Sequence, residues 1–190
     1  ILKLYSRPET VFTITEISQL FPEIRYKNLR DRLYYFTSVG KLERPHQGIY
    51  AKKGYNPLEL ANKLYTPSYI SLEFVLARVG VTFQYYETIF LISYLTRSIE
   101  VGDAKIQYRR IRGDILIKMQ GIEEKDGYFI ASVERAFLDA VYIYKNYHFD
   151  NLGGVNWDRV FELMPIYESK AFEKRVKSYY KDYQEDYGIK

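Results

Sequence analysis

Residues 13 to 53 constrain the fold most, because they combine a capped helix, a turn, a second helix and a hairpin signal. Thr13 and Glu16 fit the capping box, in which each side chain satisfies a free backbone amide at a helix start. Apolar residues then recur with helical spacing until Pro22, which cannot continue a helix. The pattern predicts a short helix that ends in a tight turn.

A second helix is predicted to begin near Arg25. Leu29, Leu33 and Phe36 recur at helical spacing, so one face of this helix must pack inward. Gly40 follows the last of these residues and is typical of a helix end.

The opposite face of the second helix carries polar and flat side chains. A helix presented in this way after a short helix and a turn is the recognition element of a helix-turn-helix, whose first residues reach base edges in the major groove of DNA. Arg pairs with guanine and Asn with adenine, while Lys and other Arg side chains hold phosphates. The outward face and its flanks contain Lys27, Asn28, Arg30, Asp31, Tyr34 and Tyr35.

Residues 41 to 53 predict two short strands around a turn that contains Pro45 and Gly48. Such a hairpin after a recognition helix suits a wing that lies against the DNA backbone. We therefore predict that residues 1 to 54 form a winged helix-turn-helix domain that binds double-stranded promoter DNA. The predicted contact residues are Arg25, Lys27, Asn28, Arg30, Arg32, Tyr34, Arg44, His46 and Gln47.

The net positive charge of the chain lies in this first part. Residues 1 to 56 contain ten Lys and Arg against five Asp and Glu, a net charge of +5, whereas the remainder contains 18 basic and 19 acidic residues, a net charge of −1. This asymmetry is typical of a protein with one nucleic-acid-binding region.

The composition excludes several classes of protein. The sequence has no cysteine, so it has no disulfide and no cysteine-ligated zinc site. No apolar run approaches the roughly 18 to 20 residues that span a bilayer, and no signal-peptide pattern opens the chain, so we expect a cytoplasmic protein without membrane contact. Because the first residue is Ile1 rather than Met, we expect part of the first helix of the winged domain to be missing.

The rest of the chain predicts an α+β fold: a linker helix in residues 55–67, and a mixed α/β domain with C-terminal helices in residues 68–190. A hinge is expected at residues 55–57. The expected elements of the second domain are a helix at 71–79, strands at 88–94, 105–112, 115–119 and 128–131, a polar turn at 123–127, a helix capped by Ser132, and helices from Trp157 onward.

Two helices of the second domain carry further predictions. Arg135 and Asp139 share the helix that follows Ser132 and are spaced for an i,i+4 ion pair, so we expect them to be structural. The last helix, at residues 169–187, is expected to pack through one aromatic and apolar face or to contact a partner. That face contains Phe172, Val176, Tyr179, Tyr180 and Tyr183.

Three segments in this order resemble the AbiEi family of type IV toxin-antitoxin antitoxins, which are regulators of viral defence. They are Gly48-Ile49-Tyr50, Tyr69-Ile70-Ser71-Leu72-Glu73, and the run from Ile130 to Asp139, and the resemblance covers most of residues 12 to 145. It implies that the winged domain represses the promoter of its own operon. It also implies that the second domain counters a nucleotidyltransferase-like toxin, without a need for direct contact. The chain departs from the pattern at Val133, where proline is common.

Two alternatives remain open. Asp114, Glu123 and Lys125 have the spacing D-x8-E-x-K, reminiscent of Mg²⁺-dependent nucleases in which carboxylates hold the metal and a lysine assists the attacking water. Because such a Glu and Lys should lie on a strand and not in a turn, we expect these residues to be surface or structural, and we expect neither an enzyme nor a cofactor. The other alternative is that the winged fold serves as a protein-interaction module.

Overall fold

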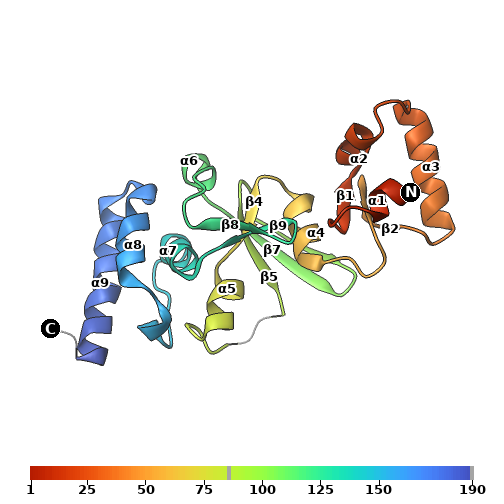
Figure 1. Ribbon diagram of the computed structural model, residues 1–190. Helices are drawn as coiled ribbons and strands as arrows, with labels where there is room; N and C mark the ends of the chain where they lie inside the picture. The colour runs from red at the N-terminus through yellow and green to blue at the C-terminus, as the bar shows by residue number, and fades with distance from the viewer. Residues whose placement is uncertain (85–86, 189–190) are drawn as a thin grey trace.

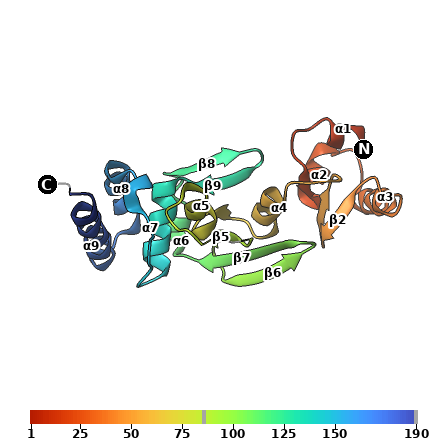
Figure 2. The same cartoon turned by 90° about the horizontal axis from the view of Figure 1, so that it is seen from below.

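The computed structural model describes residues 1–84 and 87–188 of the 190-residue chain, and the fold is α+β, as predicted. The molecule is elongated, and its two ends lie at opposite extremes (Figure 1). We call residues 1–54 the N-terminal module and residues 68–188 the sheet module. Figure 2 shows the N-terminal module at one end, the large sheet in the middle and the last helices at the other end.

The N-terminal module has its own sheet and its own core. The three strands pair in the antiparallel order β1-β3-β2. The elements are α1 (Leu2–Tyr5), β1 (Val11–Thr13), α2 (Ile14–Leu20), α3 (Tyr26–Ser38), β2 (Glu43–His46) and β3 (Ile49–Ala51). The buried side chains of its core are Leu4, Phe12, Ile17, Leu29, Leu33, Leu42 and Tyr50.

Local sequence signals explain most of this module. The predicted capping box is confirmed: the Thr13 side chain accepts from the Glu16 amide, and the Glu16 carboxylate accepts from the Thr13 amide at 2.7 Å. α3 begins after Arg25, and Gly40 follows its end with a φ of +66°, a conformation that glycine adopts without strain. The predicted hairpin is confirmed as β2 and β3. The sequence pattern missed β1, which consists of three residues directly before α2.

α4 (Pro57–Leu64) joins the two modules. Asn56 caps this helix and Pro57 occupies its first turn, so the predicted hinge is the start of a helix. Leu60 and Ala61 are fully buried. The predicted linker helix is therefore present and is packed into the structure.

The sheet module contains a six-stranded mixed sheet in the order β6-β7-β5-β4-β9-β8. β5 pairs in parallel with β7, and β4 with β9, while the other neighbours are antiparallel. Every residue of the central strand β5 is buried, as its apolar sequence predicts. The strands are β4 (Ser68–Ile70), β5 (Ile89–Ser93), β6 (Arg97–Val101), β7 (Ala104–Arg110), β8 (Ile122–Lys125) and β9 (Tyr128–Ala131).

Two predictions for this sheet are wrong. Residues 115–119 do not form a strand. They belong to α6 (Gly113–Leu116) and the turn after it, where the Arg135 guanidinium donates hydrogen bonds to the carbonyl groups of Ile115, Lys118 and Gln120. These carbonyl groups therefore do not pair with a neighbouring strand. Residues 123–127 are no single turn either. Asp126 and Gly127 both have positive φ, at +48° and +82°, which suits a two-residue hairpin turn, so the residues before them pair with β9 as β8.

The helices of the sheet module pack on the sheet and then on one another (Figure 1). α7 begins after Ser132, whose side chain accepts from the Arg135 amide, as predicted. The predicted helix at 71–79 is shorter, because Leu72 has a φ of +57° and the helix begins after it. The helices are α5 (Glu73–Leu76), η1 (Ala77–Val79), α7 (Val133–Ile143), η2 (Leu152–Gly154), α8 (Trp157–Leu163), η3 (Met164–Tyr167) and α9 (Lys170–Tyr187).

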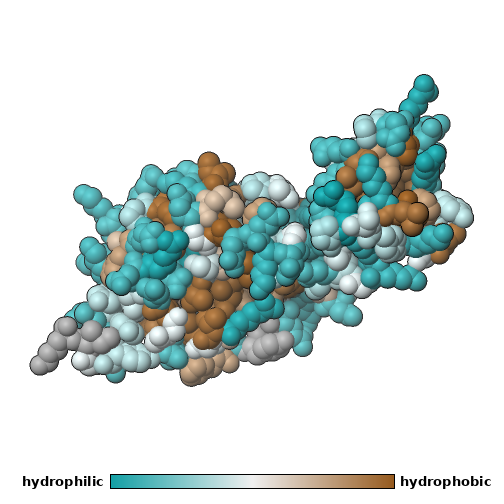
Figure 3. Space-filling model, viewed as in Figure 1, coloured by the Kyte–Doolittle hydropathy of each residue, from teal (hydrophilic) through white to brown (hydrophobic). Residues whose placement is uncertain are grey.

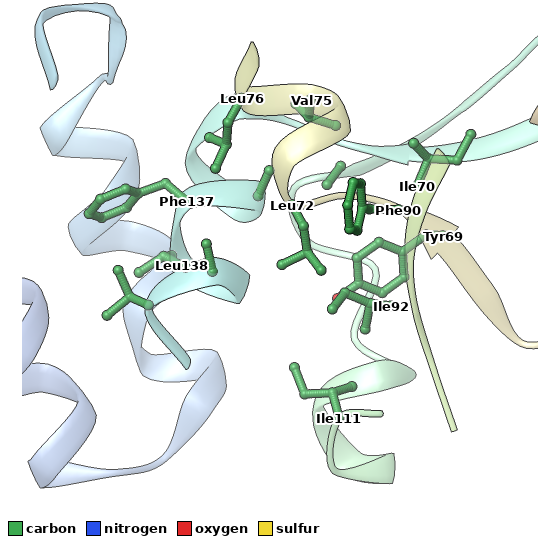
Figure 4. Packing of buried hydrophobic residues seen from close by; sticks show 14 of the residues in the cluster. Tyr69, Ile70, Leu72, Val75, Leu76, Phe90, Ile92, Ile111, Phe137 and Leu138 are labelled. Carbon is green, nitrogen blue, oxygen red and sulfur yellow. The ribbon is translucent and has the colours of Figure 1, made fainter. Parts of the chain in front are cut away.

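The main core lies between the sheet and these helices. Figure 4 shows Leu72 and Phe90 facing the side chains of α7, among them Leu138. The predicted face of α9 packs inward: Phe172 and Val176 are buried, and the three tyrosines of that face pack against the same core. The sheet module therefore has a large apolar core that is separate from the core of the N-terminal module. A smaller cluster that contains Val11, Leu60 and Val101 links the two modules.

Candidate nucleic-acid interface

α3 lies at the outer end of the molecule, and both ribbon views place it far from the last helices (Figures 1 and 2). Its inner face is fixed by Leu29 and Leu33, which are buried in the core of the N-terminal module. The remaining face is open to solvent over the length of the helix. We call its predicted contact residues the α3 surface: Arg25, Lys27, Asn28, Arg30, Arg32 and Tyr34, all of which are exposed.

Within the described part of the chain, the side chains of the α3 surface have neither a hydrogen-bond partner nor an ion-pair partner. Other cations of the same module are engaged: the Arg7 guanidinium donates to Glu9 at 2.7 Å, and the Lys52 ammonium donates to the carbonyl of Arg7. One acidic residue, Asp31, lies among the exposed residues of α3. The α3 surface therefore presents cations that no protein group neutralises.

The start of α3 adds backbone donors to these cations. Its N-cap, Arg25, provides no side-chain cap, and the first turn contains no acidic residue. The first amides of a helix have no partner within it, and the helix dipole favours an anion at that end. A phosphate group placed there would meet free amides and the side chain of Lys27 together.

The structure places the predicted wing residues on the hairpin beside α3. Arg44 is exposed on β2 with its guanidinium 5.9 Å from the centre of the Tyr50 ring. His46 is half-buried at the end of β2, with Nδ1 3.2 Å from the carbonyl oxygen of Gln47. Gln47 is exposed at the hairpin turn. All three are part of one hairpin, and Arg44 and Gln47 are accessible to a ligand.

α4 couples this module to the rest of the chain through a buried carboxylate. Glu59 is fully buried, and its carboxylate accepts from the amide and hydroxyl of Thr10, at 2.8 and 2.6 Å, and from the amide of Val11 at 3.1 Å. One turn later, the Lys63 ammonium donates to Glu16 of α2 at 2.8 Å. On the other side, Asn62 accepts from the amide of Phe129 in β9 at 2.7 Å. We call this the α4 junction.

The α4 junction was not predicted from the sequence. Its signal is a glutamate within an otherwise apolar stretch, Leu58 to Ala61, because a carboxylate at such a position must find donors when the helix is buried. The pattern does not reveal which donors those are.

Arg135 and Asp139 form a second buried polar cluster, inside the sheet module. Both side chains are fully buried, with Nε of Arg135 3.4 Å from Asp139. The Asp139 carboxylate also accepts from Ser71 at 2.8 Å and from Tyr167 at 2.7 Å. Burial lowers the pKa of the Arg135 guanidinium, but Asp139, Tyr167 and Tyr69 together outweigh burial and hold this pKa above its usual value. The predicted ion pair is confirmed.

The three residues of the nuclease-type spacing lie on two elements. Asp114 in α6 pairs with Arg112, which lowers the pKa of this carboxyl to about 2. Glu123 and Lys125 lie on the strand β8 and are exposed, so the expectation that they occupy a turn is wrong. Residues 1–84 and 87–188 contain no group of three or more His, Asp or Glu side chains arranged to hold a metal ion.

No protein-family model matches this chain, and a search of curated proteins finds no similar sequence. None of the helices in the described part of the chain combines the length and apolar character needed to cross a membrane.

Proposed function

We propose that this protein is a DNA-binding transcriptional repressor whose N-terminal module is a winged helix-turn-helix. One observation carries the proposal: the cations of the α3 surface are exposed and have no protein partner in the described chain. Charges on duplex DNA attract such a surface, and the release of counterions contributes to binding. The order of two helices and a following hairpin supports the assignment, because a recognition helix and a wing require this order.

The chemistry of the α3 surface supports a division between phosphate and base contacts. Lys27 lies in the first turn, where the free amides and the helix dipole add to its charge. Asn28 and Arg30 follow on the exposed part of α3 and match the groups that read adenine and guanine. We assign Arg32 of α3 and Arg44 of β2, both exposed, to the phosphate backbone.

The antitoxin half of the proposal depends on the order of the sequence motifs described above. The sheet module holds two of the three motifs, around Tyr69 and around Arg135. In the structure, these motifs meet at the buried Arg135 cluster, since Tyr69 accepts from the guanidinium at 2.9 Å. The motifs thus support a fold for this module that is similar to the fold of the second domain in AbiEi-type antitoxins. We propose that it counters a nucleotidyltransferase-like toxin encoded in the same operon.

The test is a salt-dependent titration of the DNA upstream of the gene with the full chain. Replacement of Lys27, Arg30 and Arg32 by Ala should weaken binding by more than about tenfold. The slope of log affinity against log salt should become less steep by about 0.9 for each phosphate contact removed.

The matched control replaces three exposed lysines of α9, Lys170, Lys174 and Lys177, which removes the same charge from a helix of the sheet module. This control should retain the affinity and the slope of the unmodified protein. Equal losses in both variants would show that only net charge matters, and no loss in either would overturn the assignment of α3.

The two proposed activities should separate in a growth assay with a co-expressed toxin. Removal of residues 1–54 is a poor test, because it would take all three donors from the buried Glu59 carboxylate. We therefore use the full-length α3 variant, which should lose promoter repression and still rescue growth. Loss of both activities in a folded variant would contradict the division between the modules.

A further inference from the structure

A cavity of about 330 Å³ lies where the N-terminal module, α4 and the β8–β9 hairpin meet. We call it the junction cavity. Its volume falls at the lower end of the range of small-molecule sites, and such sites occur preferentially between domains. It adjoins the α4 junction, since Glu16 and Lys63 are part of its wall.

One wall of the junction cavity is apolar and partly open. It is formed by Leu116, Met119, Ile122 and Phe129. Met119 and Phe129 are 50% and 38% exposed, a high fraction for large apolar side chains. Figure 3 shows patches of hydrophobic surface on the middle part of the molecule. An apolar ligand group placed here would remove this surface from water.

The lining also carries three carboxylates and one ammonium group. Glu9 is paired with Arg7, and Glu16 with Lys63. Glu124 is exposed on β8, beside its cross-strand partner Phe129 in the apolar wall, and its side chain has no ion-pair or hydrogen-bond partner among the residues that the structure describes. The cavity therefore combines an apolar wall with one carboxylate that is free to bind a cation.

Two buried polar side chains at the base of the cavity retain hydrogen-bonding capacity. Asn62 is 6% exposed, and its Nδ2 makes a single long bond, of 3.5 Å, to the carbonyl of Phe129, so one N–H remains. Ser68 is 8% exposed, and its hydroxyl donates to the carbonyl of Asn62, so its oxygen can still accept. Polar groups at fixed positions in a binding site orient the ligand.

We propose that the junction cavity binds a small organic amine with an apolar body. The ammonium group pairs with Glu124, and the apolar body packs on Phe129, Met119 and Ile122. An aromatic ring beside the ammonium group, as Phe129 provides, adds a cation–π attraction. A carboxylate ligand is disfavoured, because it would meet Glu9, Glu16 and Glu124, the three carboxylates of the lining.

A ligand in this cavity contacts both modules at once. Glu9 and Glu16 belong to the N-terminal module, while Ile122, Glu124 and Phe129 belong to the sheet module. The affinity of the ligand therefore depends on the relative position of the two modules. Ligand binding in turn favours the relative position that binds the ligand most tightly. The consequence that an amine alters DNA affinity rests on the proposed function, whereas the binding itself does not.

Phenethylamine serves as the probe and 2-phenylethanol as its neutral analogue, in calorimetric titrations of the full chain. Phenethylamine should bind saturably with one site, and 2-phenylethanol should bind about tenfold more weakly, because it lacks the charge that Glu124 recognises. Glu124→Gln should weaken phenethylamine binding by about the same factor. The matched control is Glu123→Gln, which lies on the same strand outside the cavity lining and should leave affinity unchanged.

Absence of saturable phenethylamine binding would overturn the proposal, and so would equal affinity for the amine and the alcohol. Equal effects of the two glutamate variants would place the amine outside the cavity and would also overturn it. DNA titrations with and without phenethylamine form a separate arm. If the amine binds and DNA affinity is unchanged, the result supports the ligand site and contradicts a role of the ligand in regulating DNA binding.

Discussion

The α3 surface and the Arg135 cluster use charged side chains in opposite ways. On α3, the cations are exposed and have no partner in the described chain. In the sheet module, Arg135 is fully buried and donates to Asp139, to Tyr69 and to the carbonyl groups of Ile115, Lys118 and Gln120. On α3, the charged groups remain available to a ligand. In the Arg135 cluster, the N–H groups of the guanidinium bind protein acceptors and hold three segments of the chain together.

This difference follows from the cost of burying charge. A buried charge must be paired and hydrogen-bonded, so the side chains around Arg135 are those that the fold requires. An exposed cation is solvated by water, so leaving it unpaired costs little free energy. The fold therefore does not require a protein partner for it, and its position can suit an external ligand. The α4 junction lies between these extremes, since Glu59 is buried and Glu16 is half-buried.

The largest effect is expected from breaking the Arg135 cluster. Arg135→Met leaves the Asp139 carboxylate buried without its counterion and releases the carbonyl groups of the 115–120 segment. The free energy of unfolding should fall by about 3–5 kcal/mol, measured by chemical denaturation. The control is Arg159→Met, which removes a partly exposed arginine paired with Glu162 and should lower the free energy of unfolding by less than about 1 kcal/mol. Similar losses in the two variants would contradict a structural role for the buried cluster.

An intermediate effect is expected at the α4 junction. Glu59→Gln replaces the carboxylate that accepts from Thr10 and Val11 by a neutral amide. The amide NH₂ group is itself a donor and cannot accept from them. The free energy of unfolding should be about 1.5–3 kcal/mol lower than that of the unmodified protein. Hydrogen exchange at the Thr10 and Val11 amides should accelerate more than exchange in β5. Glu43→Gln, an exposed change on β2, serves as the control, and unchanged exchange in Glu59→Gln would show that the junction does not fasten the modules.

The smallest effect is a pH dependence at Glu16. Burial raises the pKa of this carboxyl, but hydrogen bonds from Lys63 and Thr13 outweigh it, so the pKa lies below its ordinary value of 4.5. Its contribution to stability is therefore present above pH 4.5 and is lost as the pH falls through the folded-state pKa. Because the side chain is 43% exposed, the contribution should stay below about 1 kcal/mol. The difference in unfolding free energy between Glu16→Gln and the unmodified protein should shrink below pH 4.5, and a difference that grows there would contradict this assignment.

Features that depend on local chemistry were predictable from the sequence. The Thr13 cap, the apolar spacing of α3 and the Ser132 cap each involve residues within one or two helical turns. The cross-chain features were not predictable. The segment after Gly113 is apolar enough for a strand, and it becomes a helical turn because Arg135, from a distant helix, binds its carbonyl groups. The partners of Glu59 are Thr10 and Val11, at the start of β1 and far away in the sequence.

The candidate site shows the same division. The residue types and the helix of the α3 surface follow from the spacing of Leu29 and Leu33, since these residues determine which face is buried. The junction cavity could not be predicted, because its walls come from both modules and from α4, and meet only through long-range packing.

Hydrogen exchange of the full chain, with and without duplex DNA from the upstream region, tests the central claim most directly. The claim is that unpaired charge on α3 and the adjacent hairpin binds DNA, while the buried charge of the sheet module is structural. DNA should slow exchange in α3 and around Arg44 to Gly48, and should leave exchange in β9 and α7 unchanged. Bound DNA that protects the sheet module and leaves α3 unchanged would contradict the account.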